Sequence, residues 1–219
     1  MNSEFICLSY FLDDQTPLYG GSKGINIQPE RSISKGDTAN TKKIIFNNHS
    51  GTHIDFPNHF IHDGLTSEFY DANFWVFSSP YVINKFVEPN QIISFSNEEI
   101  DNIPIDTDFL IIKTGFGKFR GEDIYWESNP GFAPEVANIL RNKFKNLRVL
   151  GMDIISLTSF NNRPLGREAH KAFLGSDSPI LLVEDMNLGE LKFQPKLIVC
   201  LPTLIKGVDG APVNIIASF

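Results

Sequence analysis

The chain has 219 residues, 42% of them hydrophobic, and a formal net charge of −7 at pH 7. Lysine and arginine are scattered with no basic run longer than a pair, which argues against a surface that tracks nucleic-acid phosphates. No stretch approaches the roughly 18 consecutive apolar residues of a membrane span, and the first residues lack the features of a secretion signal. We therefore expect a single domain over residues 1–219, a cytoplasmic location, and small-molecule or protein partners, with no nucleic acid and no membrane.

Short β-strands dominate the predicted elements. In chain order, apolar runs bounded by Gly, Pro, Asn or Asp predict strands at residues 5–10, 43–47, 80–85, 109–113, 148–152, 180–184, 196–201 and 213–218. Several of these runs lack strict alternation, which is typical of strands covered on both faces. Cys7 and Cys200 each lie in such a run, so we expect two reduced thiols in the core.

One long helix is predicted over residues 134–147. Pro134 suits the first turn, and the apolar positions follow helical spacing at Val136, Ile139, Leu140, Phe144 and Leu147. Shorter helices are predicted at residues 67–73, 97–103 and 166–174. Many strands and few helices indicate an α/β fold with a mixed β-sheet core.

Three of the five histidines lie in one stretch, HSGTHIDFPNH, which begins at His49. Imidazole and carboxylate together suit zinc, manganese or iron(II), and ligands from one short segment reduce the chain entropy lost when the site closes. In an extended strand the side chains of His53 and Asp55 share a face, and His59 continues this parity. Gly51 supplies the backbone freedom for a turn that returns His49 to them. The stretch therefore predicts a metal site.

The same stretch carries the complete pattern H-x-G-T-H-x-D-x-P-x-H and so resembles the cyclase-like metal hydrolases, which include bacterial kynurenine formamidases and isatin hydrolases. Shorter matches follow in the family's order: TPLY at 16–19, LIIKTG at 110–115, GMD at 151–153 and GVDGAPV at 207–213. The resemblance implies a fold of the swivelling β/β/α type. It also implies metal-dependent hydrolysis of a C–N bond in a small formamide, amide or cyclic amide.

The resemblance further implies a role for each residue of the pattern. By analogy, His49, His53 and Asp55 would hold a first metal ion, and Asp55 would bridge to a second. His59 would be the general acid/base that takes a proton from the attacking water and returns it to the leaving nitrogen. Zinc is the favoured ion, and manganese is the alternative.

The remaining ligands implied by the resemblance lie far along the chain. We place them at His170 in the sequence REAH and at Glu184 in LVED. Asp185 beside Glu184 is a competing carboxylate, and the number of metal ions stays open at one or two per chain.

Aromatic residues near these segments favour a flat, aromatic small-molecule substrate. Tyr19 and Phe60 are the candidate substrate contacts; Phe69 and Trp75 lie in neighbouring segments. The resemblance implies a homodimer or homotetramer. His62 has no partner at a useful spacing and is expected in a loop.

Asp153 and Asp209 either orient ligand groups or simply end strands and turns, and the latter is the commoner role of such aspartates.

Two alternative functions remain open. The chain could be a lyase, dehydratase or cyclase that uses the same metal site, or a non-catalytic metal-binding protein on the same scaffold. The mass of the product separates hydrolysis, which adds water, from elimination, which removes it.

Overall fold

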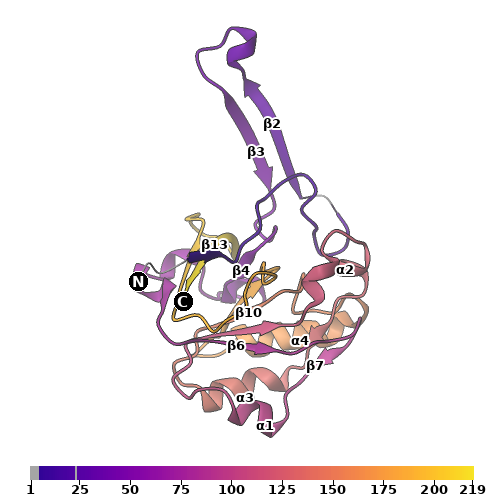
Figure 1. The fold of residues 1–219 in the computed structure, drawn as a ribbon, viewed down its shortest axis with the longest axis vertical. Helices are drawn as coiled ribbons and strands as arrows, with labels where there is room; N and C mark the ends of the chain where they lie inside the picture. Colours follow the sequence, from indigo (N-terminus) through magenta and orange to yellow (C-terminus); the bar gives the residue numbers. More distant parts are fainter. Residues whose placement is uncertain (1–4, 23) are drawn as a thin grey trace.

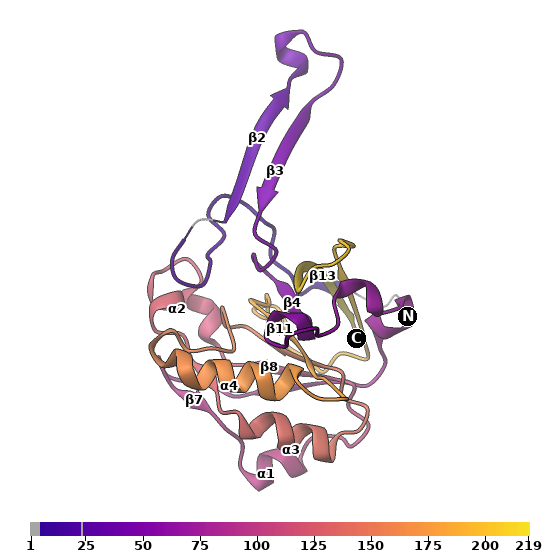
Figure 2. The same cartoon turned by 180° about the vertical axis from the view of Figure 1, so that it is seen from behind.

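The structure, a computed structural model, describes residues 5–22 and 24–219, which form four α-helices and thirteen strands (Figures 1 and 2). The helices are α1 (Asn97–Asp101), α2 (Ile124–Glu127), α3 (Glu135–Lys143) and α4 (Arg163–Leu174). The strands are β1 (Phe5–Cys7), β2 (Ile25–Arg31), β3 (Thr41–Phe46), β4 (His53–Asp55), β5 (Val76–Phe77), β6 (Pro80–Asn84), β7 (Ile92–Ile93), β8 (Phe109–Lys113), β9 (Gly131–Phe132), β10 (Val149–Met152), β11 (Leu181–Glu184), β12 (Leu197–Pro202) and β13 (Gly210–Ser218).

Four parallel strands form one half of the main sheet. β8 lies between β6 and β10, and β10 pairs on its other side with β11. The side chains of β10 and β11 are buried on both faces, as are those of β8 up to Lys113. This burial confirms the prediction drawn from their lack of alternation.

Antiparallel strands form the other half of the same sheet. β4 pairs with β11 on one side and with the first residues of β13 on the other. The rest of β13 lies between β12 and β1, and β12 also pairs with β5. The nine strands therefore make one mixed sheet, which confirms the predicted α/β class, and β4 joins its parallel and antiparallel halves.

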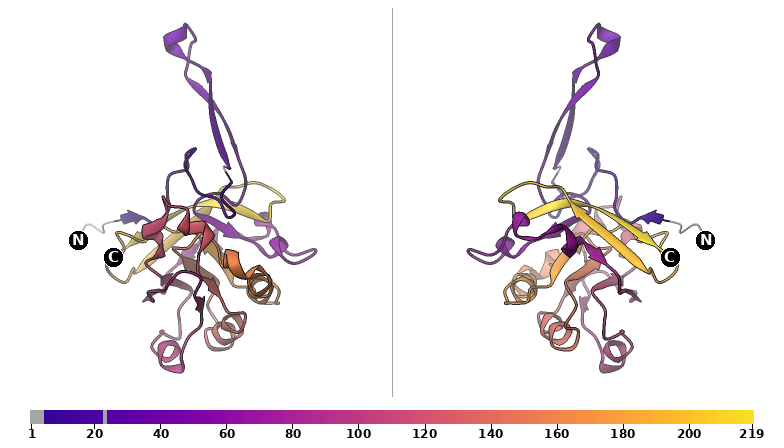
Figure 3. Two further views of the ribbon diagram at one scale, coloured as in Figure 1. Left: turned by 90° about the vertical axis from the view of Figure 1, so that its right-hand side faces the viewer. Right: turned by 90° about the vertical axis from the view of Figure 1, so that its left-hand side faces the viewer.

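The helices α1, α3 and α4 lie side by side on one side of the molecule (Figure 3). The face that α4 buries carries Gly166, Ala169 and His170 as well as Phe173 and Leu174. A polar imidazole therefore stands in an otherwise apolar face, at the place where α4 meets the sheet.

The hairpin formed by β2 and β3 projects from the opposite side of the molecule (Figure 1). Ile44 and Ile45 on β3 are 57% and 49% exposed. β3 was predicted within two residues of its bounds, but β2 was missed because its sequence, INIQPER, is polar and contains a proline.

The predicted helices are only partly confirmed. The helix predicted over residues 134–147 ends at Lys143, because Phe144 leaves the helical backbone with φ −106° and ψ 89°. Phe144 and Leu147 nevertheless stay buried. Residues 97–103 and 166–174 do contain helices, but the helix predicted at 67–73 is wrong: two 3-10 turns, Ser67–Phe69 and Ala72–Trp75, take its place.

The cysteines also differ from expectation. Cys200 is buried in β12, but Cys7 is exposed, so the prediction of two core thiols is wrong for Cys7. The physical reason is that β1 pairs with β13 alone and has an open edge on its other side. Among the residues described, no helix has both the length and the apolar character needed to cross a membrane.

Truncating a core side chain of the sheet should lower the free energy of unfolding. Leu150 on β10 is fully buried, so Leu150→Ala should lower the free energy of unfolding by about 2–5 kcal/mol. Leu204→Ala, at a side chain that is 91% exposed, should change it by less than about 0.5 kcal/mol. Urea unfolding followed by circular dichroism measures both values, and equal losses would contradict this placement of the core.

Candidate metal centre

The register of the central strands brings distant ligand types together. Glu184 on β11 is paired directly with His53 on β4, and Asp55 follows two residues later on the same strand face. All three side chains are buried. A carboxylate from the parallel half of the sheet therefore stands beside the imidazole and carboxylate of the motif.

The strand conformation does not continue to His59, as the parity argument expected. The chain leaves the strand after Asp55, and Pro57–His59 form a 3-10 turn. The fixed φ of Pro57 suits the start of such a turn. His59 reaches the site through this turn, not along the strand.

Two glycines make room for the motif histidines. Gly51 has φ +63°, a left-handed conformation that favours glycine, and its carbonyl accepts a hydrogen bond from the Nδ1–H of His53 at 2.8 Å. At Gly210 on β13, a Cβ atom would lie 2.3 Å from Cε1 of His49. The ring of His49 therefore packs against bare backbone.

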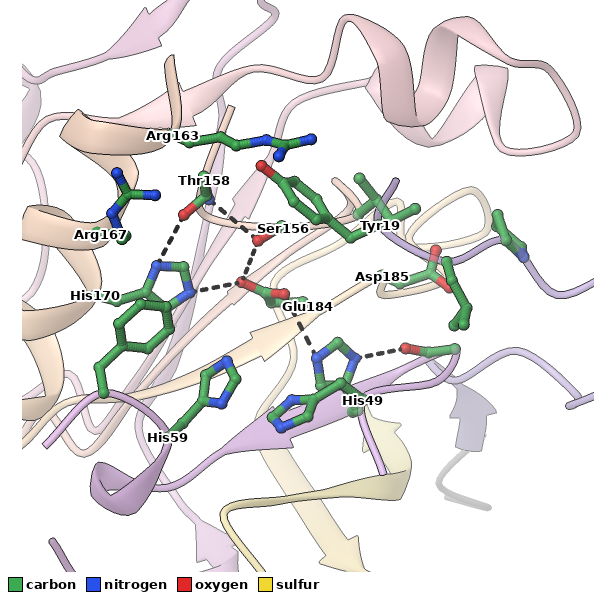
Figure 4. A pocket seen from close by; sticks show the side chains of 16 residues that line it. Tyr19, His49, His59, Ser156, Thr158, Arg163, Arg167, His170, Glu184 and Asp185 are labelled. Atoms are coloured by element: carbon green, nitrogen blue, oxygen red, sulfur yellow. Dashed lines mark hydrogen bonds and ion pairs between the residues drawn. The ribbon is translucent and has the colours of Figure 1, made fainter. Parts of the chain in front are cut away.

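Helix α4 supplies the second buried imidazole. The Nδ1–H of His170 donates to the carbonyl of Gly166 one turn earlier, at 2.9 Å, and the hydroxyl of Thr158 lies 3.0 Å from the same nitrogen. Its Nε2 consequently carries no proton in the neutral ring and faces the carboxylates of Asp55 and Glu184. Figure 4 shows His170 and Glu184 on facing sides of this cluster.

Four distances test whether a metal ion fits among these side chains. Nε2 of His53 lies 3.4 Å from Oδ1 of Asp55 and 3.5 Å from Oε2 of Glu184. Nε2 of His170 lies 3.5 Å from Oε1 of Glu184 and 3.6 Å from Oδ2 of Asp55. These separations are long for hydrogen bonds. Neighbouring ligand atoms about 2.1 Å from one ion are about 3.4 Å apart in tetrahedral coordination, so the two separations at His53 match those of a shared ion. His53, Asp55 and Glu184 therefore form a donor group that fits a divalent ion, and His170 lies beside it, facing the other oxygen of each carboxylate.

The hydrogen bonding of the two carboxylates also suits a metal ion. Among the described residues, Asp55 Oδ2 is buried and has no hydrogen-bond partner. Oε1 of Glu184 accepts from the backbone N–H of Leu157 at 2.6 Å and lies 3.3 Å from the hydroxyl of Ser156. Glu184 is thus held in place by its surroundings, whereas Asp55 presents an oxygen without a hydrogen bond to the centre of the cluster.

His49, Asp55 and His59 form a second, overlapping group. His49 Nδ1 lies 2.9 Å from Asp55, and Asp209 binds both His49 Nε2, at 3.0 Å, and His59 Nδ1, at 2.8 Å. The set proposed for a first metal is therefore divided: His53 lies with Glu184, His49 lies with His59, and Asp55 is common to both groups.

Burial and neighbouring charges shift the pKa values of the ionisable groups in the cluster. Burial would lower the pKa of His53 and of His170, but hydrogen bonding and charge interactions with Asp55 and Glu184 outweigh burial and raise each pKa to about 9. Burial lowers the pKa of His59, and the charge of Asp55 only partly opposes this. The pKa of Asp209 falls to about 2 despite its partial burial, because His49 and His59 hydrogen-bond to it.

Asp185 does not compete with Glu184 as a ligand. Its carboxylate accepts three hydrogen bonds from the guanidinium of Arg120, at 2.8–3.0 Å, and one from the hydroxyl of Tyr125 at 2.7 Å. Its backbone has φ +52°, and its carbonyl accepts a hydrogen bond from the hydroxyl of Thr52 at 2.6 Å. This buried network holds the chain immediately after Glu184.

A pocket of about 390 Å³ opens above the cluster (Figure 4). Both candidate substrate contacts line it: Tyr19 forms part of one wall, and Phe60 stacks on the ring of His170 with centroids 4.3 Å apart. Phe69 and Trp75 do not line this pocket; Phe69 is exposed, and Trp75 packs in the core. Of the four aromatic residues named from the sequence, Tyr19 and Phe60 therefore line the pocket, and their contact with a substrate stays a prediction.

Several pocket residues escaped the sequence analysis. Arg163 and Arg167 line the pocket. They lie seven and three residues ahead of His170, and this spacing is the signal that identifies them, since all three share one helix face. Asp209 contacts two motif histidines, which no local spacing reveals. His62 is 94% exposed and pairs with Asp63, as expected of a loop residue.

A mixed sheet with a buried group of imidazoles and carboxylates beneath an open pocket defines an α/β protein with a candidate metal site. Residues 6–158 match the Cyclase family, described as "Putative cyclase", and the chain belongs to this family. A kynurenine formamidase of Bacillus cereus is 23% identical over 213 residues, which cover 97% of this chain and 96% of the relative.

Solved structures share the fold. Isatin hydrolase A from Labrenzia aggregata superposes with a TM-score of 0.81 at 21% identity, covering 99% of this chain and 93% of that one. A predicted metal-dependent hydrolase from Bacillus stearothermophilus gives a TM-score of 0.77 at 19% identity, covering 100% and 99%. The similarity to these structures extends along the entire chain.

Removing the shared carboxylate should abolish metal binding. Asp55 belongs to both ligand groups, so Asp55→Asn should lose at least about 90% of the bound divalent metal, measured by plasma mass spectrometry after gel filtration. Asp63→Asn, in an exposed loop, is the matched control and should keep its metal. Full metal content in Asp55→Asn would show that the metal binds elsewhere.

Proposed function

We propose that this chain is a metal-dependent hydrolase that cleaves a C–N bond, other than a peptide bond, in a small formamide, amide or cyclic amide. The observation that carries the proposal is the buried group of His53, Asp55 and Glu184, with Nε2 of His53 3.4 Å and 3.5 Å from an oxygen of each carboxylate. Membership of the cyclase family and the similarity to a kynurenine formamidase and an isatin hydrolase support the same class of reaction.

The residues that would hold the metal are His53, Asp55 and Glu184, with His170 beside them. His49 together with Asp55 would contribute to a second site. A bound divalent ion polarises a substrate carbonyl and makes water acidic enough to attack near neutral pH. Imidazole nitrogen and carboxylate oxygen as donors favour zinc, with manganese as the alternative. The hydrogen bonds to the carbonyls of Gly51 and Gly166 fix the tautomer that leaves each Nε2 free to bind.

His59 is the general acid/base of the proposed reaction. Its Nδ1–H donates to Asp209, so its Nε2 is the basic nitrogen, and its ring lines the pocket. It takes the proton of the attacking water and returns it to the leaving nitrogen. Asp209 holds the ring in the orientation that this transfer needs, as carboxylates do for catalytic histidines.

The pocket suits a flat substrate. The ring of Phe60 extends the wall formed by His170, and Tyr19 closes another wall together with Pro17 and Leu18. Apolar and aromatic walls next to a few convergent polar groups are typical of small-molecule sites. An aryl formamide or an aromatic cyclic amide is the substrate class that we propose.

The proposal is tested on protein purified without chelator. It should contain one or two divalent ions per chain and hydrolyse N-formylkynurenine or isatin, and the products together should exceed the substrate by the mass of one water. His59→Gln should keep the ion bound by His53, Asp55 and Glu184 but lose at least about 100-fold in kcat. His62→Gln, at an exposed imidazole, is the control. Loss of water from the substrate, or metal without turnover, would contradict hydrolysis.

We also infer a homodimer or homotetramer. The projecting hairpin exposes Ile33, Ile44 and Ile45, and an isolated two-stranded hairpin is marginally stable in water. A second copy that covers these side chains would stabilise it.

Light scattering coupled to gel filtration should give a mass of two or four chains. Ile44→Ser combined with Ile45→Ser should shift the protein toward the monomer, because it removes apolar surface from the hairpin. Leu204→Ser, at a more exposed apolar position outside the hairpin, should leave the mass unchanged. A monomeric wild-type protein at all concentrations would contradict the assembly.

A further inference from the structure

Two adjacent carboxylates border the candidate metal site, but only one of them belongs to its ligand group. Glu184 is the last residue of β11 and lies with the buried ligands, and Asp185 follows it directly. Both residues line the pocket, and Asp185 stands to one side of the cluster, away from His170 (Figure 4). Because Asp185 is 1% exposed, water does not compensate its charge. The protein therefore has to satisfy a second buried carboxylate right beside the site.

The backbone of Asp185 is held in an unusual conformation. Its φ of +52° lies in the left-handed region, which costs an aspartate more than a glycine and persists only where the surroundings fix it. The backbone N–H of Asp185 donates to the carbonyl of Ile154 at 2.8 Å, and its own carbonyl accepts from the hydroxyl of Thr52 at 2.6 Å. Since Thr52 directly precedes His53, Asp185 ties the end of β11 to the start of β4.

Arg120 holds the carboxylate of Asp185 from outside the pocket. Its Nε donates to Oδ1 and its Nη2 to Oδ2, each at 2.8 Å, in the two-bond geometry that gives strong and directional pairing. The guanidinium also lies 3.8 Å from the centroid of the Tyr10 ring. The hydroxyl of Tyr125 adds a third donor, 2.7 Å from Oδ1. Neither Arg120 nor Tyr125 is among the residues that line the pocket, so both oxygens of Asp185 are bound by donors that lie outside it.

Resting on the metal centre of the hydrolase proposed above, we propose that Arg120 is a positioning residue that selects Glu184 over Asp185 as a metal ligand. The ion pair compensates the charge of Asp185 and keeps its carboxylate out of the ligand group, which leaves Glu184 as the carboxylate of this segment that binds. Buried carboxylates are paired with cations or coordinate metals. Without the guanidinium, Asp185 therefore competes with Glu184 for the ion and distorts its coordination.

A pair of substitutions tests this role without any substrate. Arg120→Gln should weaken the binding of Co²⁺ at least about tenfold, measured by competition with a chelator. It should also change the visible absorption spectrum of the bound Co²⁺, which reports the coordination geometry. Adding Asp185→Asn should bring the affinity back to within about threefold of the wild-type value and restore the spectrum, because asparagine carries no charge and tolerates a positive φ. Asp185→Asn alone completes the cycle, and its Co²⁺ affinity should match that of the double variant.

A second arginine provides the matched control. Arg148 pairs with the carboxylate of the buried Asp108, and both line a different pocket from the one above the metal site. Arg148→Gln should therefore leave the affinity and spectrum of Co²⁺ unchanged. Urea unfolding with chelator present measures how much each substitution destabilises the metal-free chain, so that a loss of stability is not mistaken for a loss of binding.

Tyr125→Phe repeats the test with the cation in place, which matters if Arg120→Gln does not fold. It removes one donor to Asp185 and should weaken Co²⁺ binding about threefold, and Asp185→Asn should again cancel the loss.

Equal losses of Co²⁺ affinity in Arg120→Gln with and without Asp185→Asn would overturn the proposal, because the arginine would then act only through the packing of its own segment. Unchanged affinity and spectrum in Arg120→Gln would overturn it as well. If Asp185→Asn restores Co²⁺ binding as expected but the wild-type chain hydrolyses neither N-formylkynurenine nor isatin, the positioning role stands and only the proposed reaction is contradicted.

Discussion

The pairing of β4 with β11 is the constraint on which the site depends. It sets His53 opposite Glu184 in a sheet whose central strands are buried on both faces. Because successive side chains of a strand point to opposite faces, a slip of one residue would turn His53 and Asp55 away from Glu184 together. The burial of Ile54, between the two ligands, fixes the register from the other face. The same strand register thus buries Ile54 in the core and brings His53 and Asp55 to Glu184.

Burying this many ionisable groups requires compensation. Asp55 and Glu184 lie within a few per cent of complete burial, and uncompensated charges there would cost several kcal/mol each. The protein supplies part of the compensation through the backbone N–H of Leu157 and through imidazoles whose other nitrogens are tied to carbonyls. The rest falls to a divalent ion, which would satisfy the free oxygen of Asp55.

The pocket has two chemically different ends joined by one helix. α4 carries His170 toward the buried carboxylates and carries Arg163 and Arg167 along the same face toward the pocket wall. The rings of Tyr19 and Phe60 line the space between these groups.

The sequence by itself determined the α/β class, most strands of the sheet and the local motif, because apolar runs, helical spacing and the two-residue period of a strand are visible in the order of residues. It placed His170 and Glu184 only through a family resemblance. Tertiary structure alone decided that His59 arrives on a 3-10 turn, that Asp209 holds two histidines, and that Cys7 sits at an open edge. These features depend on which strands pair and in which register, and such long-range pairings leave no periodic trace in the sequence.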